Sequence, residues 1–361
     1  MIVRDLQIEP LRLRLRNPLV TARGTWEFRS GAVLVVSDGE RRGFGEATPL
    51  DLDPLAAERT REVLSQVAEV LRGRELAESL DWVDAFLDGL EPLTRMASAR
   101  HAVESALADL LAQRQGLPLA RLLAEGQPRA RIEVNALLDG ASPEALATQA
   151  RQAADRGFRV FKVKVGVGPI GEDDDRLAKV REAIGPSAQI RIDANGGWAP
   201  EEAKGHLELL CRHGIELCEQ PVPAHALDAL RALRGAVPCR IAADESAFGV
   251  EEARALYDDA APAVDVIVLR PMVLGGVLRT LSIAREAAAH GVGTYIASSL
   301  DGTVARASAV HAAAALPGAD WACGLGVGAL FVDLDEGIYA PSRGRITVPD
   351  VAGLGLSGRM A

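Results

Sequence analysis

Two different rhythms of hydrophobic and polar residues divide the chain. In the first 50 residues apolar and polar positions alternate, as in Leu11–Leu15, and a second apolar run follows at Ala32–Val36. A period of two predicts antiparallel strands with one buried face. The segments 17–31 and 43–51 contain glycine and proline, and we predict that both are loops.

From about residue 54 to 124 the apolar spacing lengthens to three and four residues, as at Ala102, Val103, Ala106 and Leu107. This spacing predicts amphipathic helices. Strands followed by helices are typical of an α+β module. We therefore expect residues 1–125 to form an α+β capping domain, which the last residues, about 329–361, return to complete.

Beyond residue 130, short apolar runs alternate with helical stretches rich in Ala, Glu and Arg. Eight of these runs are candidate strands: Glu133–Leu138, Val160–Val165, Gln189–Ala194, Glu216–Gln220, Arg240–Ala243, Val264–Leu269, Val292–Ala297 and Asp320–Gly324. Eight strand–helix units predict an α/β fold of the (β/α)8 type, a modified TIM barrel, over residues 130–328. A doubly wound open sheet is the competing architecture, but no G-x-G-x-x-G motif follows an early strand.

Polar residues or glycine end the later strands at nearly equal spacing. Successive members of this series are 25 to 29 residues apart: Lys164, Asp193, Glu219, Asp244, Arg270, Ser298 and Gly324. Because one repeat of that length holds a strand, a helix and their loops, these positions should lie at one height. That height is the C-terminal mouth, where barrel enzymes carry their chemistry.

Three members of the series are acids that would meet at this mouth: Asp193, Glu219 and Asp244. Three carboxylates in one place repel one another unless a cation neutralises them. Oxygen donors without His or Cys favour Mg²⁺ over zinc, with Mn²⁺ as an alternative ion. Three protein ligands leave room for a substrate carboxylate, so we predict a small-molecule carboxylate as the partner.

Lysine is rare in this chain. It supplies four of the 40 basic residues, and two of the four lie in one tripeptide, Lys162-Val163-Lys164. Lysine can lose its proton near neutral pH when its surroundings depress its pKa, whereas arginine cannot. We predict that Lys164 is a general base for a C–H proton next to a carboxylate, that Lys162 assists it, and that the metal stabilises the enolate.

The overall charge limits the classes of partner. The formal net charge is −10, which argues against nucleic acid and anionic membranes as partners. No apolar run approaches the roughly 18 residues of a spanning helix, and the N-terminus has no signal-peptide pattern. We expect a cytoplasmic protein, and the pattern leaves the oligomeric state open.

Five motifs together resemble the enolase superfamily, muconate-lactonizing subgroup. They are Lys162-Val-Lys164, Arg191-Ile-Asp193-Ala-Asn195, Glu219-Gln-Pro221, Ala243-Asp244-Glu245-Ser246 and Arg270-Pro-Met-Val-Leu-Gly275-Gly276. Within the subgroup, Ser298-Ser299 and Ala322-Cys-Gly324-Leu-Gly326 most resemble the o-succinylbenzoate synthases. That resemblance implies a magnesium-dependent lyase of menaquinone biosynthesis, which dehydrates 2-succinyl-6-hydroxy-2,4-cyclohexadiene-1-carboxylate.

The resemblance also implies residue roles. Lys164 would remove the proton and then protonate the leaving hydroxyl, with Lys162 and Arg270 beside the reaction. The residues that would contact the substrate are Ser298, Ser299, Gly324, Asn195 and Arg191. Arg23, Trp26 and Phe28, in the predicted loop 17–31, are further candidates.

One residue departs from the family pattern. The family usually has a lysine before the proline of strand six, and here that residue is Arg270. A racemase needs a proton-transfer group on each face of its substrate, and arginine is a poor one, so Arg270 favours dehydration. An N-succinylamino acid racemase or dipeptide epimerase stays the alternative enzyme, and a non-catalytic carboxylate-binding paralogue stays the alternative from another class.

Overall fold

The computed structural model describes residues 1–21, 24–53, 55–140, 142–258, 261–318, 321–332 and 334–356. The chain begins with a three-stranded antiparallel sheet of β1 (Asp5–Thr21), β2 (Gly24–Ser37) and β3 (Arg42–Ala47). The expected strands are therefore confirmed, but the predicted loops at 17–31 and 43–51 are largely wrong.

The segment 17–31 is strand because it forms the outer half of a long hairpin. Leu19 lies opposite Trp26, and the register shifts between Arg14 and Leu19. This irregularity contains Pro18, which cannot donate a ladder hydrogen bond and is tolerated at bulges. Proline in this stretch therefore marks a break in the register within the strand.

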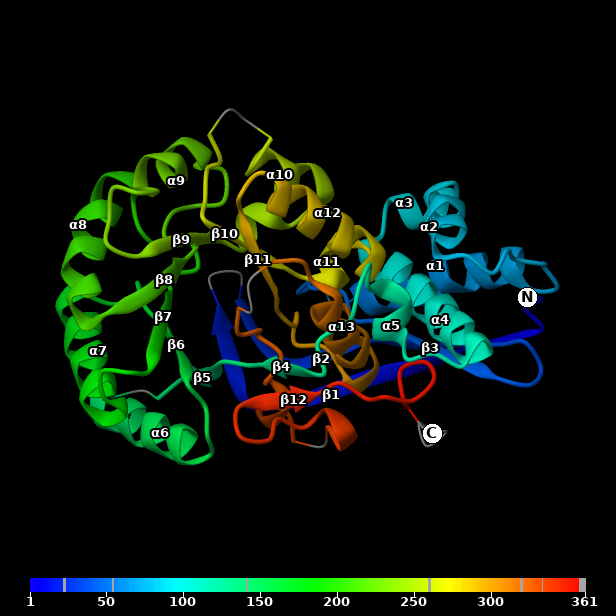
Figure 1. Cartoon of the computed structure of the whole chain (residues 1–361), viewed down its shortest axis with the longest axis horizontal. Helices are drawn as coiled ribbons and strands as arrows, with labels where there is room; N and C mark the ends of the chain where they lie inside the picture. Colours follow the sequence, from blue (N-terminus) through cyan, green and yellow to red (C-terminus); the bar gives the residue numbers. More distant parts are fainter. Residues whose placement is uncertain are drawn as a thin grey trace.

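Five helices complete the N-terminal part, on the right of Figure 1. They are α1 (Ala56–Leu71), α2 (Leu80–Asp88), α3 (Glu91–Thr94), α4 (Ala97–Gln115) and α5 (Leu119–Leu123). Helix α4 packs directly on β3. A Cβ atom on Gly43 or Gly45 would lie 2.0 or 1.8 Å from the carbonyl oxygen of Ala106 or Ala102, so only glycine allows this approach.

The C-terminal part is a barrel-like α/β domain, as expected. Seven parallel strands are neighbours in chain order: β5 (Ala136–Leu138), β6 (Val160–Lys164), β7 (Gln189–Asp193), β8 (Ile215–Glu219), β9 (Arg240–Ala243), β10 (Val266–Leu269) and β11 (Gly293–Ile296). The helices that follow them are α6 (Pro143–Asp155), α7 (Ile170–Ile184), α8 (Pro200–Leu210), α9 (Leu227–Leu233), α10 (Val250–Ala255), α11 (Pro271–Leu274) with α12 (Val277–Ala289), and α13 (Thr303–Ala315). Figure 1 shows α6 to α10 in an arc outside the strands.

In the described residues, the eighth strand consists of two bridged residues. Cys323 bridges Val134 and Gly324 bridges Ala297, both in parallel, and these bridges join the two edges of the seven-stranded sheet. In the described residues after them, the short 3-10 helices η3 (Gly328–Leu330) and η4 (Gly337–Tyr339) occur in place of an eighth α-helix. The expectation of eight full strand–helix units is corrected to seven units and a closing bridge.

The final segment contacts both parts of the molecule. Strand β12 (Arg345–Thr347) pairs antiparallel with β4 (Arg131–Glu133) beside the barrel. The Leu354 amide donates to Asp109 of α4. The division of the chain near residues 125–130 stays a prediction.

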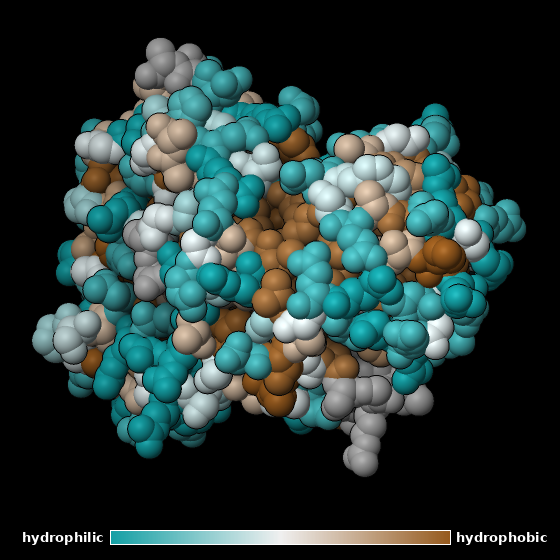
Figure 2. All heavy atoms as spheres, turned by 45° about the vertical axis from the view of Figure 1, so that its right-hand side comes forward, coloured by the Kyte–Doolittle hydropathy of each residue, from teal (hydrophilic) through white to brown (hydrophobic). Residues whose placement is uncertain are grey.

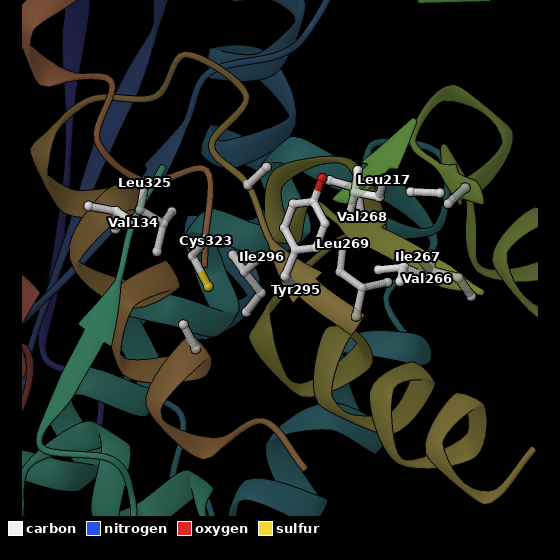
Figure 3. Close-up of a cluster of buried hydrophobic side chains, with 14 of the residues drawn as sticks. Val134, Leu217, Val266, Ile267, Val268, Leu269, Tyr295, Ile296, Cys323 and Leu325 are labelled. Carbon is white, nitrogen blue, oxygen red and sulfur yellow. The ribbon is translucent and has the colours of Figure 1, made fainter. Parts of the chain in front are cut away.

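The largest hydrophobic cluster fills the barrel and the space under its helices. Figure 3 shows part of it, with labelled side chains from β8, β10 and β11 together with Val134, Cys323 and Leu325. A small third cluster of Leu15, Trp26 and Phe331 lies where the hairpin meets the final segment. Within the described residues, no helix combines the length and the hydropathy needed to cross a membrane.

Candidate active site

The barrel ladder brings the predicted lysine and acids to one edge. Lys164 lies opposite Asp193 in the β6–β7 pairing, and Asp193 lies opposite Glu219 in the β7–β8 pairing. Asp244 directly follows β9. These side chains therefore meet at the C-terminal ends of four adjacent strands, as the equal spacing predicts.

Lys162 forms the centre of this cluster. Its Nζ lies 2.8 Å from Asp193 Oδ2 and 2.6 Å from Glu219 Oε1. Burial disfavours the ammonium, but the charges of Asp193 and Glu219 outweigh it and raise the pKa of Lys162 above its usual value. Lys162 is thus held as a permanent cation, and its ion pairs tie two of the predicted metal ligands together.

Arg270 makes a comparable contact with the third acid. Its Nε and Nη2 donate to the two oxygens of Asp244 at 2.7 and 2.5 Å, and its Nη1 donates to the Ser298 carbonyl. Burial works against this guanidinium as well, but Asp244 raises the pKa of Arg270 further above its already high value. The arginine is therefore both charged and fixed.

Lys164 differs from both of these cations. Its side chain lines the cavity at the mouth and makes no ion pair or side-chain hydrogen bond with any described residue. Strands β6 and β10 are separated by β7, β8 and β9 on one side of the barrel, and by β5, the closing bridge and β11 on the other. Lys164 and Arg270 therefore face each other across the mouth.

In the described part of the chain, no three His, Cys, Asp or Glu side chains already surround a cation position. The three predicted ligands instead form ion pairs with Lys162 and Arg270. Carboxylates that lie this close together attract the nearest positive groups. The expected convergence on one ion is thus replaced here by side-chain ion pairs.

The donor chemistry still fits a hard divalent cation. All donors are carboxylate oxygens on adjacent strand ends, which suits Mg²⁺. Four carboxylates, those of Asp193, Glu219, Asp244 and Glu245, surround the two cations that pair with them, Lys162 and Arg270. The carboxylates outnumber these two cations by two, and a divalent cation would offset this formal excess.

Glu245 is a site residue to which the sequence assigned no role. It lines the cavity, receives a hydrogen bond from Asn195 Nδ2 at 3.1 Å, and has a buried Oε2 without a hydrogen-bond partner. Burial, and then the charges of Asp244, Asp193 and Glu219, raise the pKa of Glu245 to about 7. Such an orphaned acceptor in a cavity is satisfied by a cation or by a ligand N–H group.

The cavity above these charges has a volume of about 370 Å³. Its charged lining residues all belong to the cluster just described, and the rest of the lining is mostly apolar. The apolar part comes from the hairpin, from strand ends and from the final segment, including Leu19, Trp26, Leu50, Leu137, Phe248, Leu300, Val327 and Leu330. Figure 2 shows a face of the molecule with hydrophobic surface gathered in a central hollow and hydrophilic surface around it.

The structure brings most of the predicted substrate contacts together. Ser298, Ser299, Gly324 and Asn195 line the cavity, and so does Trp26. Phe28 does not line it, because its ring packs against Arg12. Arg23 lies outside the described residues.

Arg191 is not part of the cavity lining. It is 1% exposed, and its side chain lies inside the barrel below the site. Its Nε donates to Glu216 at 2.6 Å and its Nη1 to the Ala322 carbonyl at 2.7 Å. The period-two pattern of β7 does put Arg191 on the same face as Asp193, but one layer deeper, so we withdraw it as a substrate contact.

Two buried charged residues, which sequence reasoning missed, dock the N-terminal sheet on the cavity wall. Glu46 accepts the Gly302 and Ala305 amides at the start of α13, at 2.6 and 3.1 Å. Arg29 donates to the carbonyls of Ser299 and Leu300. The only sequence signal for Glu46 is its position between two small residues, Gly45 and Ala47. Such residues allow close packing, which buries the acid.

Comparisons with known proteins agree with this architecture. Residues 4–124 match the mandelate racemase / muconate lactonizing enzyme N-terminal domain, and residues 145–361 match the enolase C-terminal domain-like family. The chain belongs to the enolase superfamily.

Relatives of two activities resemble it. An L-Ala-D/L-Glu epimerase of Clostridium acetobutylicum is 32% identical over 87% of each chain. A chloromuconate cycloisomerase of Delftia acidovorans is 31% identical over 86% of this chain and 84% of its own. The crystal structure of a dipeptide epimerase from Enterococcus faecalis, complexed with Mg and the dipeptide L-Leu-L-Tyr, has a TM-score of 0.86 and 26% identity, with coverage of 98% of this chain and 99% of that one.

These similarities correct the finer part of the sequence prediction. The relatives and solved structures that the chain resembles are epimerases and cycloisomerases, so the assignment as an o-succinylbenzoate synthase, a lyase of menaquinone biosynthesis, is wrong. Of the residues that suggested it, Ser298, Ser299, Gly324 and Gly326 line the cavity, but their presence there does not select one activity.

Proposed function

We propose that this protein is a magnesium-dependent epimerase that acts on the carbon next to the carboxylate of a dipeptide or a related N-acyl amino acid. The observation that carries the proposal is the position of Lys164, which lies beside three carboxylates at the mouth of an apolar cavity and makes no ion pair with any described residue. The similarity to dipeptide epimerases over nearly the full chain length supports it.

The residues suit removal of a weakly acidic proton. Asp193, Glu219 and Asp244 would hold Mg²⁺, and the ion would neutralise the charge that develops on the substrate carboxylate as the enolate forms. Lys164 accepts the α-proton with its neutral amine and returns it to the enolate. Lys162 keeps the carboxylates of Asp193 and Glu219 in place, and the apolar walls limit the access of water to the enolate.

The side of the substrate that faces Arg270 limits the rate of inversion. Arg270 faces Lys164 but stays protonated near neutral pH, so it does not exchange a proton with carbon. Its guanidinium can stabilise the negative charge of the enolate. Inversion then needs a proton from a weaker donor, such as water admitted on that side, and should be slower than exchange at Lys164.

A chiral separation tests the proposed reaction. Purified protein with Mg²⁺ is incubated with hydrophobic L,L-dipeptides and N-acyl amino acids, and the appearance of the epimer is followed by chromatography. We expect epimer only with metal present. Absence of epimer from every dipeptide and N-acyl amino acid would contradict the proposal.

Cycloisomerization is the second candidate, because Arg270 leaves one face without a proton-transfer side chain and a cycloisomerase needs only one. The similarity to chloromuconate cycloisomerases supports it. Its test is the loss of ultraviolet absorbance of muconate or chloromuconate with Mg²⁺. Turnover of muconate without dipeptide epimerization would select this candidate, and loss of both activities would favour a carboxylate-binding role without catalysis.

A further inference from the structure

Tyr295 lies beneath the site with its hydroxyl on one of the predicted metal ligands. The side chain is 2% exposed, and its hydroxyl donates to Glu219 Oε2 at 2.6 Å. Tyr295 belongs to β11 and Glu219 ends β8, with β9 and β10 between them. The tyrosine therefore reaches across the barrel interior, and Figure 3 shows its hydroxyl end directed toward Leu217 of β8.

This contact fixes the second of the two Glu219 oxygens. Lys162 holds Oε1 at 2.6 Å, and the Tyr295 hydroxyl holds Oε2 at the same distance. Glu219 has no exposed surface. Of the three predicted ligands it has the longest side chain, and so has most rotamer freedom to lose before its oxygens can be aimed at an ion.

Arg191 in turn holds the tyrosine ring. Its guanidinium lies 4.9 Å from the ring centroid of Tyr295. The arginine is anchored on the other side by Glu216 and by the Ala322 carbonyl. A stacked and anchored cation restricts the motion of the ring and so helps to keep the hydroxyl on Glu219.

We propose that Tyr295 is a positioning residue that aims Glu219 at the metal ion, with Arg191 bracing the ring from below. The inference rests on the proposed function, because it requires Glu219 to be a metal ligand. Groups that hydrogen-bond to metal ligands orient them, and their removal costs about 10- to 100-fold in metal affinity. The cost arises because Glu219 must then be ordered when the ion binds.

The test variant is Tyr295→Phe, which removes the hydroxyl and keeps the ring against Arg191. Tyr257→Phe is the matched control, because Tyr257 is also buried and its hydroxyl donates to a glutamate, Glu286, between helices α10 and α12. Mn²⁺ affinity is measured by calorimetry and by the electron spin resonance signal of the bound ion. The Mg²⁺ concentration for half-maximal activity and the thermal midpoint are measured alongside.

We expect Tyr295→Phe to weaken Mn²⁺ binding about tenfold or more and to raise the half-activating Mg²⁺ concentration similarly, with kcat at saturating Mg²⁺ close to that of the native protein. Tyr257→Phe should bind Mn²⁺ as the native protein does, with a comparable fall in thermal midpoint. Equal Mn²⁺ affinity in all three proteins would overturn the role of Tyr295. A native protein that binds no Mn²⁺ would overturn the metal site itself and, with it, this inference.

Discussion

The two sides of the barrel mouth present different cations to the same space. On the β6 side, Lys164 lines the cavity with no ion pair to any described residue. On the β10 side, Arg270 holds both oxygens of Asp244 and the Ser298 carbonyl. Under the proposed function, the β6 side gives and takes the proton, whereas the β10 side only holds charge.

This difference teaches that a shared metal site does not fix the reaction. Both sides face the same carboxylates, and both fit a metal-stabilised enolate. Whether the enolate is protonated from one face or from two depends on residue 270, because lysine exchanges protons near neutral pH and arginine does not. The asymmetry predicts an epimerase whose two half-reactions differ in rate.

The largest expected effect comes from the β6 side. Lys164→Ala should slow α-proton exchange by about 10²- to 10⁴-fold, the usual contribution of a general base. Exchange is measured with hydrophobic dipeptides in deuterated buffer.

Lys204→Ala is its control, because Lys204 lies on the exposed face of α8 and pairs with Glu208. Retained exchange in Lys164→Ala, with Mn²⁺ binding intact, would remove Lys164 from the mechanism.

The β10 side offers a gain of function. Arg270→Lys should raise the rate of inversion about tenfold or more, because it puts a titratable amine opposite Lys164. Chiral chromatography of both epimers measures inversion in each direction.

Arg270→Met should lower turnover without abolishing it, since only charge stabilisation is lost. If Arg270→Lys inverts no faster than the native protein, residue 270 does not limit inversion.

The smallest expected effect concerns stability at low pH. It arises from a histidine outside the barrel mouth and can be measured without any reaction at the mouth. His311 of α13 is buried, accepts the Ala120 amide at Nδ1 and contacts the Tyr339 hydroxyl at Nε2. Burial lowers the pKa of His311 from 6.5 to about 4. As the pH falls, the unfolded chain takes up this proton before the folded protein does. The contribution of the neutral His311 to the free energy of unfolding is therefore complete above pH 6.5 and is lost as the pH falls toward 4. The loss is on the order of 3 kcal/mol.

Thermal melts at pH 7 and pH 4.5 measure this contribution. The midpoint of the native protein should fall more between the two than that of His311→Gln, whose amide oxygen can still accept from Ala120. An equal fall in both proteins would assign the acid sensitivity to other groups.

The barrel strands could be predicted from the sequence because each is a short apolar run between helical stretches. The predicted Arg240–Ala243 coincides with β9, and β6, β7 and β8 lie within a residue of their predicted bounds. The outer half of the hairpin could not be recognised from the sequence. Leu19 pairs with Trp26 only because the register shifts between Arg14 and Leu19, and the alternation of residues does not reveal such a shift. The eighth strand was overestimated, because the described part of it pairs with its neighbours through the bridges of Cys323 and Gly324 and forms no longer ladder.

The charged residues of the site could be predicted from the sequence, but the depth of each residue inside the barrel could not. Equal spacing identified Lys164, Asp193, Glu219 and Asp244, because one repeat returns the chain to the same edge. Depth inside the barrel leaves no such trace, so Arg191 was placed one layer too high. The substrate could not be deduced either, since the relatives that the chain resembles have different activities.

Deuterium exchange of the separate epimers of one dipeptide is the most direct test of the central claim. Each epimer is incubated with protein and Mg²⁺ in deuterated buffer, and loss of the α-proton signal and formation of the other epimer are followed by proton NMR. The asymmetry predicts that one epimer exchanges its proton with retention much faster than it inverts, by about 10²-fold or more. In the other epimer, loss of the α-proton should keep pace with inversion. Equally fast exchange in both epimers would contradict the account, because it would require a competent base on the Arg270 side.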